Sequence, residues 1–364
     1  NNIQHKLDQI SLIVRENLTG IRVIRAFASQ KKEISKFTRE TSNQKDIQIK
    51  KVTDKISLRI ANLLAGNTGK INSKIISEIV DTINKEHIEL VFFDDSIYGN
   101  AIKIIKKCCP NVKIAAFYHD IKRYLAVEWA KQNPKSIPIQ ISLVTNERKT
   151  AQYADVNIVL NEREEKLFQK YYHNLPEMLL PIILPTPKLS NRVVSDKCNI
   201  LFVGGYYYPN VNGFKWFVEN VAPLIKINYE VTLVGNRMDL LKDEFSDNSN
   251  VKVLGRVEDL SLYYENASVV VGPIFEGAGM KVKTAEALSY GKIFIGTDES
   301  LIGYKELAGE LLGKSIIVCN NEEEFASAIN NMDFGNGFCT ENYEFFLKNY
   351  SIEAATCKLK TLLN

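Results

Sequence analysis

The stretch LFVGGYYYPNVNGFKWF (201–217) decides the fold class of this sequence. It reads as an apolar strand that begins at Cys198, a turn built on two glycines, and then a helix. The same alternation continues through the C-terminal half, where we expect strands at YEVTLVG (229–235), VKVLG (251–255), ASVVVGP (267–273), KIFIG (292–296) and SIIVC (315–319). Continuous Val, Ile and Leu runs separated by helices are typical of a parallel sheet buried on both faces. Ligands of such sheets bind at the carboxyl ends of the strands.

A weaker form of this alternation precedes it. Strands are expected at LVFFD (90–94), VKIAAFYHD (112–120) and ADVNIVL (154–160). The connector LPEMLLPIILPTPKL (175–189) marks a domain boundary, because proline stiffens extended linkers. The fold class is therefore α/β, with a pair of Rossmann-type domains preceded by a helical segment. We place the domains at 54–185 and 186–340, and a C-terminal helical segment at 341–364.

Composition excludes several classes of protein. The chain of 364 residues has 46 Lys and Arg against 43 Asp and Glu, a balance that argues against a nucleic-acid partner. We find no apolar run long enough to span a bilayer and no signal peptide. The six cysteines form no CxxC pair, so reduced thiols in a cytoplasmic protein are expected. Only four histidines are present, and they are scattered, which argues against a zinc site.

Two common phosphate-binding signatures, the Walker A loop and GxGxxG, are absent. GNTGK (66–70) is too short for a Walker A loop and lacks its Ser or Thr. GELLGKS (309–315) has only three residues between its glycines, and a strand follows where a helix is required. No GxGxxG follows any strand, which argues against a nicotinamide dinucleotide site.

The stretch FEGAGMKVKTAEALSYG (275–291) carries the candidate chemistry. The backbone of its GAG turn (277–279) can approach a ligand closely, and the N-terminus of the following helix is a natural seat for a phosphate. Lys281 and Lys283 would supply compensating positive charge, and Glu286 would accept hydrogen bonds from sugar hydroxyls. The alternative is a structural turn followed by an ordinary helix.

Three motifs in the C-terminal half occur in an order and spacing that resemble one family. They are F-V-G…P-N…G…W-F, then G-x-V-x-D-L…Y, then G-A-G…K…E-A…G, within about residues 198–320. This part of the chain resembles the nucleotide-sugar domain of the retaining GT-B glycosyltransferases of family 4. The resemblance implies sugar transfer, with retention, from a nucleotide-sugar to a saccharide or lipid-linked acceptor in bacterial cell-surface polysaccharide synthesis. It also implies that no metal or other cofactor is required and that the protein can associate peripherally with the inner face of the membrane.

The same resemblance indicates which residues bind the donor. Glu286 matches the second acid of the family's E-x7-E signature and is expected to bind the nucleotide ribose. Ala278 stands at the position of the first acid, which puts the usual contact to the donor sugar in doubt. Gly205 replaces an arginine of many relatives, and Lys281 and Lys283 are candidates to replace that charge. The implied donor-binding residues are Gly204, Gly205, Asn212, Val257, Glu258, Gly277, Ala278, Gly279, Lys281, Lys283 and Glu286.

The segment VFFDDSIYGNAIKIIKKCCPNVKIAAFYHDIKRY (91–124) resembles the acceptor domain of the same enzymes. Those enzymes carry a D-S-S-x-Y-G turn after one strand and end the next strand in F-H-N-x-E. His119 and Asp120 fall at the His-Asn of the second motif, which implies that they are catalytic, whereas a lone histidine is more often structural. The opening strand and Gly-rich loop of a full acceptor domain are not recognisable, so we expect the domain at 54–185 to be incomplete.

Residues 1–53 differ from the rest and are expected to be helical. RENLTGIRVIRAFASQKKEISKF (15–37) resembles a segment of ABC exporter transmembrane subunits that includes a coupling helix. Neither an ATP-binding motif nor a complete membrane helix accompanies it. The simplest hypothesis is a gene fusion of an exporter fragment with a glycosyltransferase. Two alternatives stay open: a catalytically impaired or non-catalytic nucleotide-sugar-binding fragment, and an accessory piece of an exporter.

Overall fold

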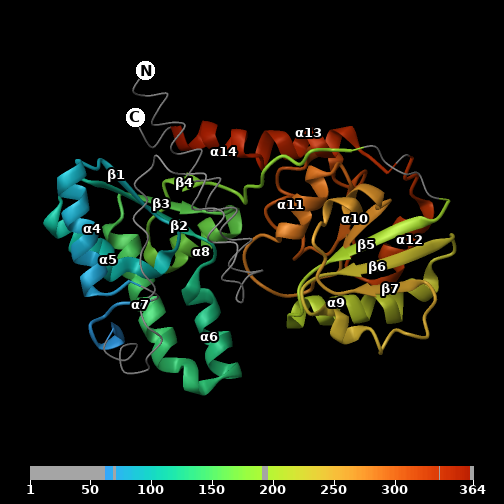
Figure 1. Cartoon of the computed structure of the whole chain (residues 1–364), viewed down its shortest axis with the longest axis horizontal. Coiled ribbons are helices and arrows are strands. Elements are labelled where there is room, and N and C mark those ends of the chain that lie inside the picture. The colour runs from blue at the N-terminus through green and yellow to red at the C-terminus, as the bar shows by residue number, and fades with distance from the viewer. Residues whose placement is uncertain (1–61, 69–70, 191–195, 336, 361–364) are drawn as a thin grey trace. The chain divides into compact units, whose positions relative to one another are not determined.

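The computed structural model describes residues 62–68, 71–190, 196–335 and 337–360 (Figure 1). The expected helical segment at 1–53 lies outside the described residues. The described chain divides into two compact units, an N-terminal unit that ends at Leu180 and a C-terminal unit that begins at Pro181.

The N-terminal unit is built on a parallel sheet of four strands in the order β1-β2-β3-β4. The strands are β1 (Leu90–Phe93), β2 (Lys113–Tyr118), β3 (Val156–Val159) and β4 (Met178–Leu179). The helices are α4 (Ser73–Glu86), α5 (Gly99–Cys108), α6 (Lys122–Gln132), α7 (Ile137–Tyr153) and α8 (Glu162–Tyr172), with short 3-10 turns at Ser96–Tyr98 and Pro134–Ser136. The first three strands lie where the sequence predicts them, whereas β4 was not expected.

Local sequence explains where the helices of this unit begin. Asn72 caps α4, since its side chain accepts a hydrogen bond from the backbone N–H of Ile75. Asn161 caps α8 in the same way, and three glutamates in the first turn of α8 complement the helix dipole. The core between helices and sheet is apolar, with Ile102, Ile105 and Ile114 fully buried.

The C-terminal unit is built on a parallel sheet of six strands in the order β10-β9-β8-β5-β6-β7. The strands are β5 (Cys198–Val203), β6 (Tyr229–Val234), β7 (Val251–Leu254), β8 (Val269–Gly272), β9 (Ile293–Gly296) and β10 (Ile316–Val318). The helices are α9 (Tyr208–Trp216), α10 (Ser261–Asn266), α11 (Val282–Ser289), α12 (Glu322–Asn331), α13 (Thr340–Asn349) and α14 (Ile352–Leu359), with a π-helical turn at Phe217–Val221 and short 3-10 turns at Ala222–Leu224, Met238–Leu241 and Gly309–Leu311. Every strand that the sequence predicts in this half is present.

The strand order of the C-terminal sheet reverses at β5, which pairs with β6 on one side and β8 on the other. The chain leaves β5 into α9 and leaves β8 into α11, so both connections lie at the switch point of the sheet. Open α/β sheets bind their ligands at such a point. The predicted α/β fold class is confirmed.

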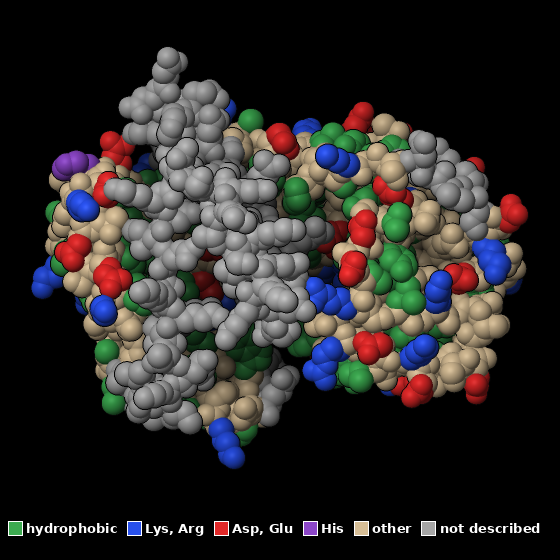
Figure 2. All heavy atoms as spheres, viewed as in Figure 1, with side chains coloured by type: hydrophobic (Ala, Val, Ile, Leu, Met, Phe, Trp, Pro, Cys, Tyr) green, Lys and Arg blue, Asp and Glu red, His purple; other side chains and the backbone are tan. Residues whose placement is uncertain are grey.

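The surface of the C-terminal unit carries charges of both signs. Figure 2 shows its acidic and basic side chains interspersed over the visible face rather than gathered into one patch. Among the described residues, no helix combines the length and the apolar character that crossing a bilayer requires.

Candidate functional site

The turn after β5 is closed by an asparagine side chain. Asn210 donates a hydrogen bond from Nδ2 to the carbonyl of Gly205 at 2.9 Å. A Cβ added to Gly204 would lie 2.8 Å from Cγ of Asn210, so this turn needs glycine where the amide side chain folds back. Asn212, the predicted donor-binding residue of this segment, is exposed. Asn210 was missed, although it is the asparagine of the P-N pair in the quoted motif.

The GAG turn that precedes α11 has the positive φ angles that its glycines allow. Gly277 has φ 137° and Gly279 has φ 64°, values that L side chains rarely adopt. Lys281, at the N-cap of α11, places Nζ 3.3 Å from the carbonyl oxygens of both Ala278 and Gly279. The same Nζ lies 2.7 Å from Oε1 of Glu299, a residue that sequence reasoning missed. The turn is therefore held against the start of its helix by a paired lysine.

Lys283 joins the two turns of the switch point. Its Nζ donates to Oδ1 of Asn210 at 2.7 Å and lies 4.4 Å from the ring centroid of Phe202, and the residue is only 9% exposed. Burial, together with the positive charge of Lys281, lowers the pKa of Lys283 to about 7, although Glu286 opposes the shift. A buried ammonium of this kind gains stability when an anion comes next to it.

Glu286 lies one turn further along the same helix and is 7% exposed. Its Oε2 accepts a hydrogen bond from the hydroxyl of Tyr264 at 3.0 Å. Tyr264 is fully buried and stacks on Tyr290 with ring centroids 5.0 Å apart, which fixes the direction of that hydrogen bond. A carboxylate can accept further hydrogen bonds at its two oxygens, as binding of a ribose would require. Tyr264 was not among the predicted residues.

Val257 and Glu258 follow β7, which is separated from β5 by β6. Val257 is half-buried and Glu258 is exposed. Both follow the carboxyl end of a strand, as a ligand contact would require, and they stay predictions.

In the N-terminal unit, the predicted catalytic residues belong to a cluster of charges. Nε2 of His119 lies 2.9 Å from the carbonyl oxygen of Asp94 and 3.3 Å from its Oδ1. Burial lowers the pKa of His119, but the hydrogen bond and the charges of Asp94 and Asp95 outweigh it, so the pKa is raised. Asp120 pairs through Oδ1 with Nζ of Lys122 at 2.6 Å. The structure thus brings the two predicted motifs of this unit together.

Glu147 ties these two motifs to each other. Its fully buried carboxylate accepts hydrogen bonds from the Ser96 hydroxyl at 3.0 Å and from the backbone N–H groups of Lys122 at 2.7 Å and Arg123 at 3.1 Å. The Tyr172 hydroxyl donates a fourth hydrogen bond. Burial raises the pKa of Glu147, and these hydrogen bonds oppose the rise. The carboxylate therefore caps the start of α6 and holds the turn after β1.

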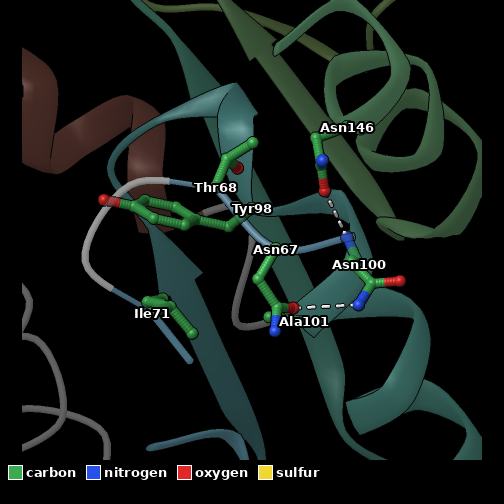
Figure 3. A pocket seen from close by; sticks show the side chains of 7 residues that line it. All are labelled: Asn67, Thr68, Ile71, Tyr98, Asn100, Ala101 and Asn146. Atoms are coloured by element: carbon green, nitrogen blue, oxygen red, sulfur yellow. Dashed lines mark hydrogen bonds between the residues drawn. The ribbon is translucent and has the colours of Figure 1, made fainter. Parts of the chain in front are cut away.

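A small hollow, with essentially no room for a water-sized sphere, lies near the start of α5 (Figure 3). Amide side chains surround it, with Asn67 accepting from Asn100 at 2.9 Å and Asn146 accepting from the N–H of Asn100 at 2.8 Å. Ligand pockets for small molecules begin at about 300 Å³, so this hollow is too small for a nucleotide-sugar. Within the described ranges, no group of three or more His, Cys, Asp or Glu is arranged to hold a metal ion.

The structure contains two α/β units, each with a parallel sheet. In the C-terminal unit, helix α11 begins where the strand order reverses, a position that favours binding of a phosphate. This arrangement is typical of the GT-B class of fold. Crystal structures of that class match this chain. Anabaena Alr3699/HepE in complex with UDP matches with TM-score 0.63 and 12% identity over 82% of this chain and 84% of that one. A glycosyltransferase from Rickettsia africae ESF-5 matches with TM-score 0.60 and 14% identity over 81% of this chain and 82% of that one.

Sequence comparison identifies the C-terminal unit. Residues 197–332 match the family described as "Glycosyl transferases group 1". An "Uncharacterized 44.6 kDa protein in cps region" of Klebsiella pneumoniae is 29% identical over 146 residues, which is 37% of this chain and 37% of that relative's length. Residues 197–332 therefore resemble a glycosyltransferase domain, which supports the enzyme class expected from the sequence.

Proposed function

We propose that the protein transfers a sugar from a nucleotide-sugar to a saccharide or lipid-linked acceptor with retention of anomeric configuration, as enzymes of family 4 do. The observation that carries the proposal is the buried Lys283, which links the glycine turn after β5 to the start of α11 at the switch point. A buried cation beside two glycine turns suits the diphosphate of a nucleotide-sugar. The match of residues 197–332 to a glycosyltransferase family supports the same function.

In this proposal, the donor diphosphate lies at the N-terminus of α11. Lys283 and the backbone N–H groups of the GAG turn stabilise the negative charge that develops as the nucleoside diphosphate leaves. Each positioned donor of this kind contributes on the order of 3 kcal/mol to lowering the barrier. Glu286 accepts hydrogen bonds from the ribose. No metal is assigned a role.

The proposed catalytic residues of the N-terminal unit are His119 and Asp120. The raised pKa of His119 favours an imidazolium, which can donate a hydrogen bond to a hydroxyl of the transferred sugar. Asp94 fixes the direction of that ring through its contact with Nε2.

Structural neighbours and one relative bear on the ligand and the pathway. Anabaena Alr3699/HepE has also been crystallised with UDP-glucose, a structure that matches this chain with TM-score 0.59. The Klebsiella relative is described as lying in a cps region, which supports a role in cell-surface polysaccharide synthesis. The second candidate is a nucleotide-sugar-binding protein without catalysis, which arose by gene fusion. It is favoured by the sheet of the N-terminal unit, which has four described strands against six in the C-terminal one.

Calorimetric titration with UDP, UDP-sugars and GDP-sugars, followed by an assay for released nucleotide, tests the proposal. We expect binding of one donor class, weakened in Lys283→Met and retained in Lys252→Met, which removes an exposed lysine of β7. Binding without release of nucleotide in the presence of acceptors would favour the second candidate. Absence of binding to every donor would refute both.

A further inference from the structure

Glu299 brings a carboxylate to the GAG turn from the neighbouring strand. β9 lies beside β8 and parallel to it, so the connections that follow these two strands begin at the same edge of the sheet. Oε1 of Glu299 lies 2.7 Å from Nζ of Lys281, and it would lie 3.9 Å from a Cβ built on Gly277. The side chain of Glu299 is 17% exposed. It therefore lies at the turn proposed to hold the donor diphosphate, and it keeps some access to solvent.

The backbone that carries Glu299 is fixed on both sides. The hydroxyl of Thr297 donates a hydrogen bond to the carbonyl of Ile274, which precedes the GAG turn. The hydroxyl of Thr284, in α11, donates to the carbonyl of Ser300 at 2.9 Å. Both threonines and Ser300 are at most 1% exposed. These buried hydrogen bonds tie the residues on either side of Glu299 to the GAG connection and to α11, so its carboxylate is preorganised.

The adjacent acid, Asp298, has different partners. Its Oδ1 pairs with Nζ of Lys305, and its Oδ2 accepts a hydrogen bond from Nδ2 of Asn320 at 2.8 Å. These two contacts lower the pKa of Asp298. Lys305 belongs to the same connection and Asn320 follows β10, on the side of β9 away from the GAG turn. Of the two neighbouring acids, Glu299 is therefore the one that contacts the GAG turn.

The ion pair with Lys281 explains how a carboxylate can lie beside an anion site. A carboxylate alone would repel a diphosphate, but Lys281 and Glu299 have opposite charges that offset each other. An ionised carboxylate donates no hydrogen bond and accepts at about four lone-pair positions, which one ammonium does not fill. Next to the diphosphate of a nucleotide-sugar, the groups that can donate to such a carboxylate are the hydroxyls of the sugar.

We infer that Glu299 accepts hydrogen bonds from the hydroxyls of the transferred sugar and makes the site selective for a neutral sugar over a hexuronic acid. Hydroxyl donors suit a charged acceptor, and hydrogen bonds of this kind are stronger than those between neutral groups. Because Lys281 is already paired with Glu299, a carboxylate on the donor would bring a second negative charge to a single ammonium. The inference rests on the proposed function, since it requires the diphosphate at the N-terminus of α11.

Calorimetric titration of the full chain with matched donors tests the selectivity. UDP-glucose and UDP-glucuronate differ only at carbon 6 of the sugar, and GDP-mannose and GDP-mannuronate form the equivalent pair for a chain that binds guanine nucleotides. We expect the unaltered chain to bind the neutral donor about tenfold more tightly than the acidic one, and Glu299→Gln to remove most of this preference. Thermal melting establishes that the variant, which conserves the size of the side chain, is folded.

The hydroxyl contact has a readout of its own. Analogues of the neutral donor that lack one sugar hydroxyl at a time are titrated against the unaltered chain and against Glu299→Ala. At least one analogue should bind the unaltered chain about tenfold more weakly than the parent donor, and Glu299→Ala should abolish that difference. Because the parent donor and its analogue carry the same diphosphate, any effect of releasing Lys281 from its ion pair cancels in the comparison.

Glu276→Gln is the matched control, because it removes the same charge at an exposed position directly before Gly277. Its preference for the neutral donor should equal that of the unaltered chain. Equal affinity of the unaltered chain for both donors, a preference unchanged in Glu299→Gln, or the same loss in Glu276→Gln would overturn the inference. In each of these cases the donors still bind, so the proposed function stands. Failure to bind any nucleotide-sugar would instead remove the proposed function and the inference with it.

Discussion

Binding of a nucleotide-sugar should be accompanied by uptake of a proton at Lys283. In the free protein, burial and the nearby charge of Lys281 lower the pKa of Lys283 to about 7, so the side chain is largely neutral at pH 8. A diphosphate beside Nζ would favour the ammonium form and raise the pKa again. Binding above pH 7 must therefore draw a proton from solvent.

The size of the effect follows from the contacts. One unit charge at about 4 Å contributes roughly 4 kcal/mol at an effective dielectric of about 20, equivalent to about three pKa units. A pKa that returns to 9 or above leaves Lys283 charged in the complex at pH 8. The expected uptake is then about 0.9 proton per donor bound at pH 8 and about 0.1 at pH 6. Linkage requires the dissociation constant to rise close to tenfold per pH unit near pH 8.

Calorimetry measures this uptake directly. UDP-glucose is titrated at pH 8 in two buffers with different enthalpies of ionisation, and the difference in observed heat gives the number of protons. UDP-glucose is the suitable ligand because both of its phosphates are diesters with fixed charge. Lys283→Met is the control, and should bind more weakly with no uptake. Less than about 0.2 proton for the unaltered chain, against the 0.9 expected from the lowered pKa, would refute the assignment of Lys283 to the diphosphate. The same uptake in Lys283→Met would refute it equally.

Three further predictions concern single side chains. Gly204→Ala should weaken donor binding and lower the free energy of unfolding in urea by about 1–3 kcal/mol, because its Cβ would lie 2.8 Å from the amide side chain of Asn210. Gly205→Ala is the control: the nearest atom to its Cβ is 3.7 Å away, so the loss should be under about 1 kcal/mol. Glu147→Ala should lower the free energy of unfolding by about 3 kcal/mol at pH 7, since four donors, of which the Ser96 hydroxyl is fully buried, lose their acceptor; a loss under 1 kcal/mol would contradict the capping role. Asp94→Asn should lower the pKa of His119 in an NMR titration. Because the folded pKa is raised, the stabilisation is present below pH 6.5 and is lost as pH rises through the folded value, so Asp94→Asn should destabilise the protein more at pH 5.5 than at pH 8.

The strands of the C-terminal unit could be predicted because each is an apolar run with glycine or a helix at its end. Such runs are buried on both faces of a parallel sheet, so the local pattern and the tertiary environment agree. β4 was missed because Met178–Leu179 is only two residues long and lies in a proline-spaced connector. Its pairing with β3 depends on tertiary structure, and no local hydrophobic periodicity predicts it.

The candidate site could be predicted only in part, for a reason of geometry. Sequence motifs identify glycines at turns and charged residues at the start of a helix, and here they identified the GAG turn, Lys283 and Glu286. They do not show which side chains from other strand–helix connections contact these residues. Asn210, Tyr264 and Glu299 are each brought to the site by a different strand, at separations from their partners that no periodicity links.

The two lysines of α11 cannot have equal roles toward a diphosphate. Lys281 already pairs with the carboxylate of Glu299 at 2.7 Å and contacts two carbonyls, so its charge is largely compensated within the protein. Turning it toward phosphate would leave Glu299 facing a second anion at a partly buried position, which costs free energy. Lys283 contacts an amide oxygen and an aromatic face, neither of which neutralises an ammonium, and the charge of Glu286 offsets its desolvation only in part, since the pKa of Lys283 stays lowered. The positive charge of Lys283 is therefore the less compensated of the two in the free protein, and an anionic donor would stabilise it more. We expect Lys283 to be the dominant contact of the diphosphate.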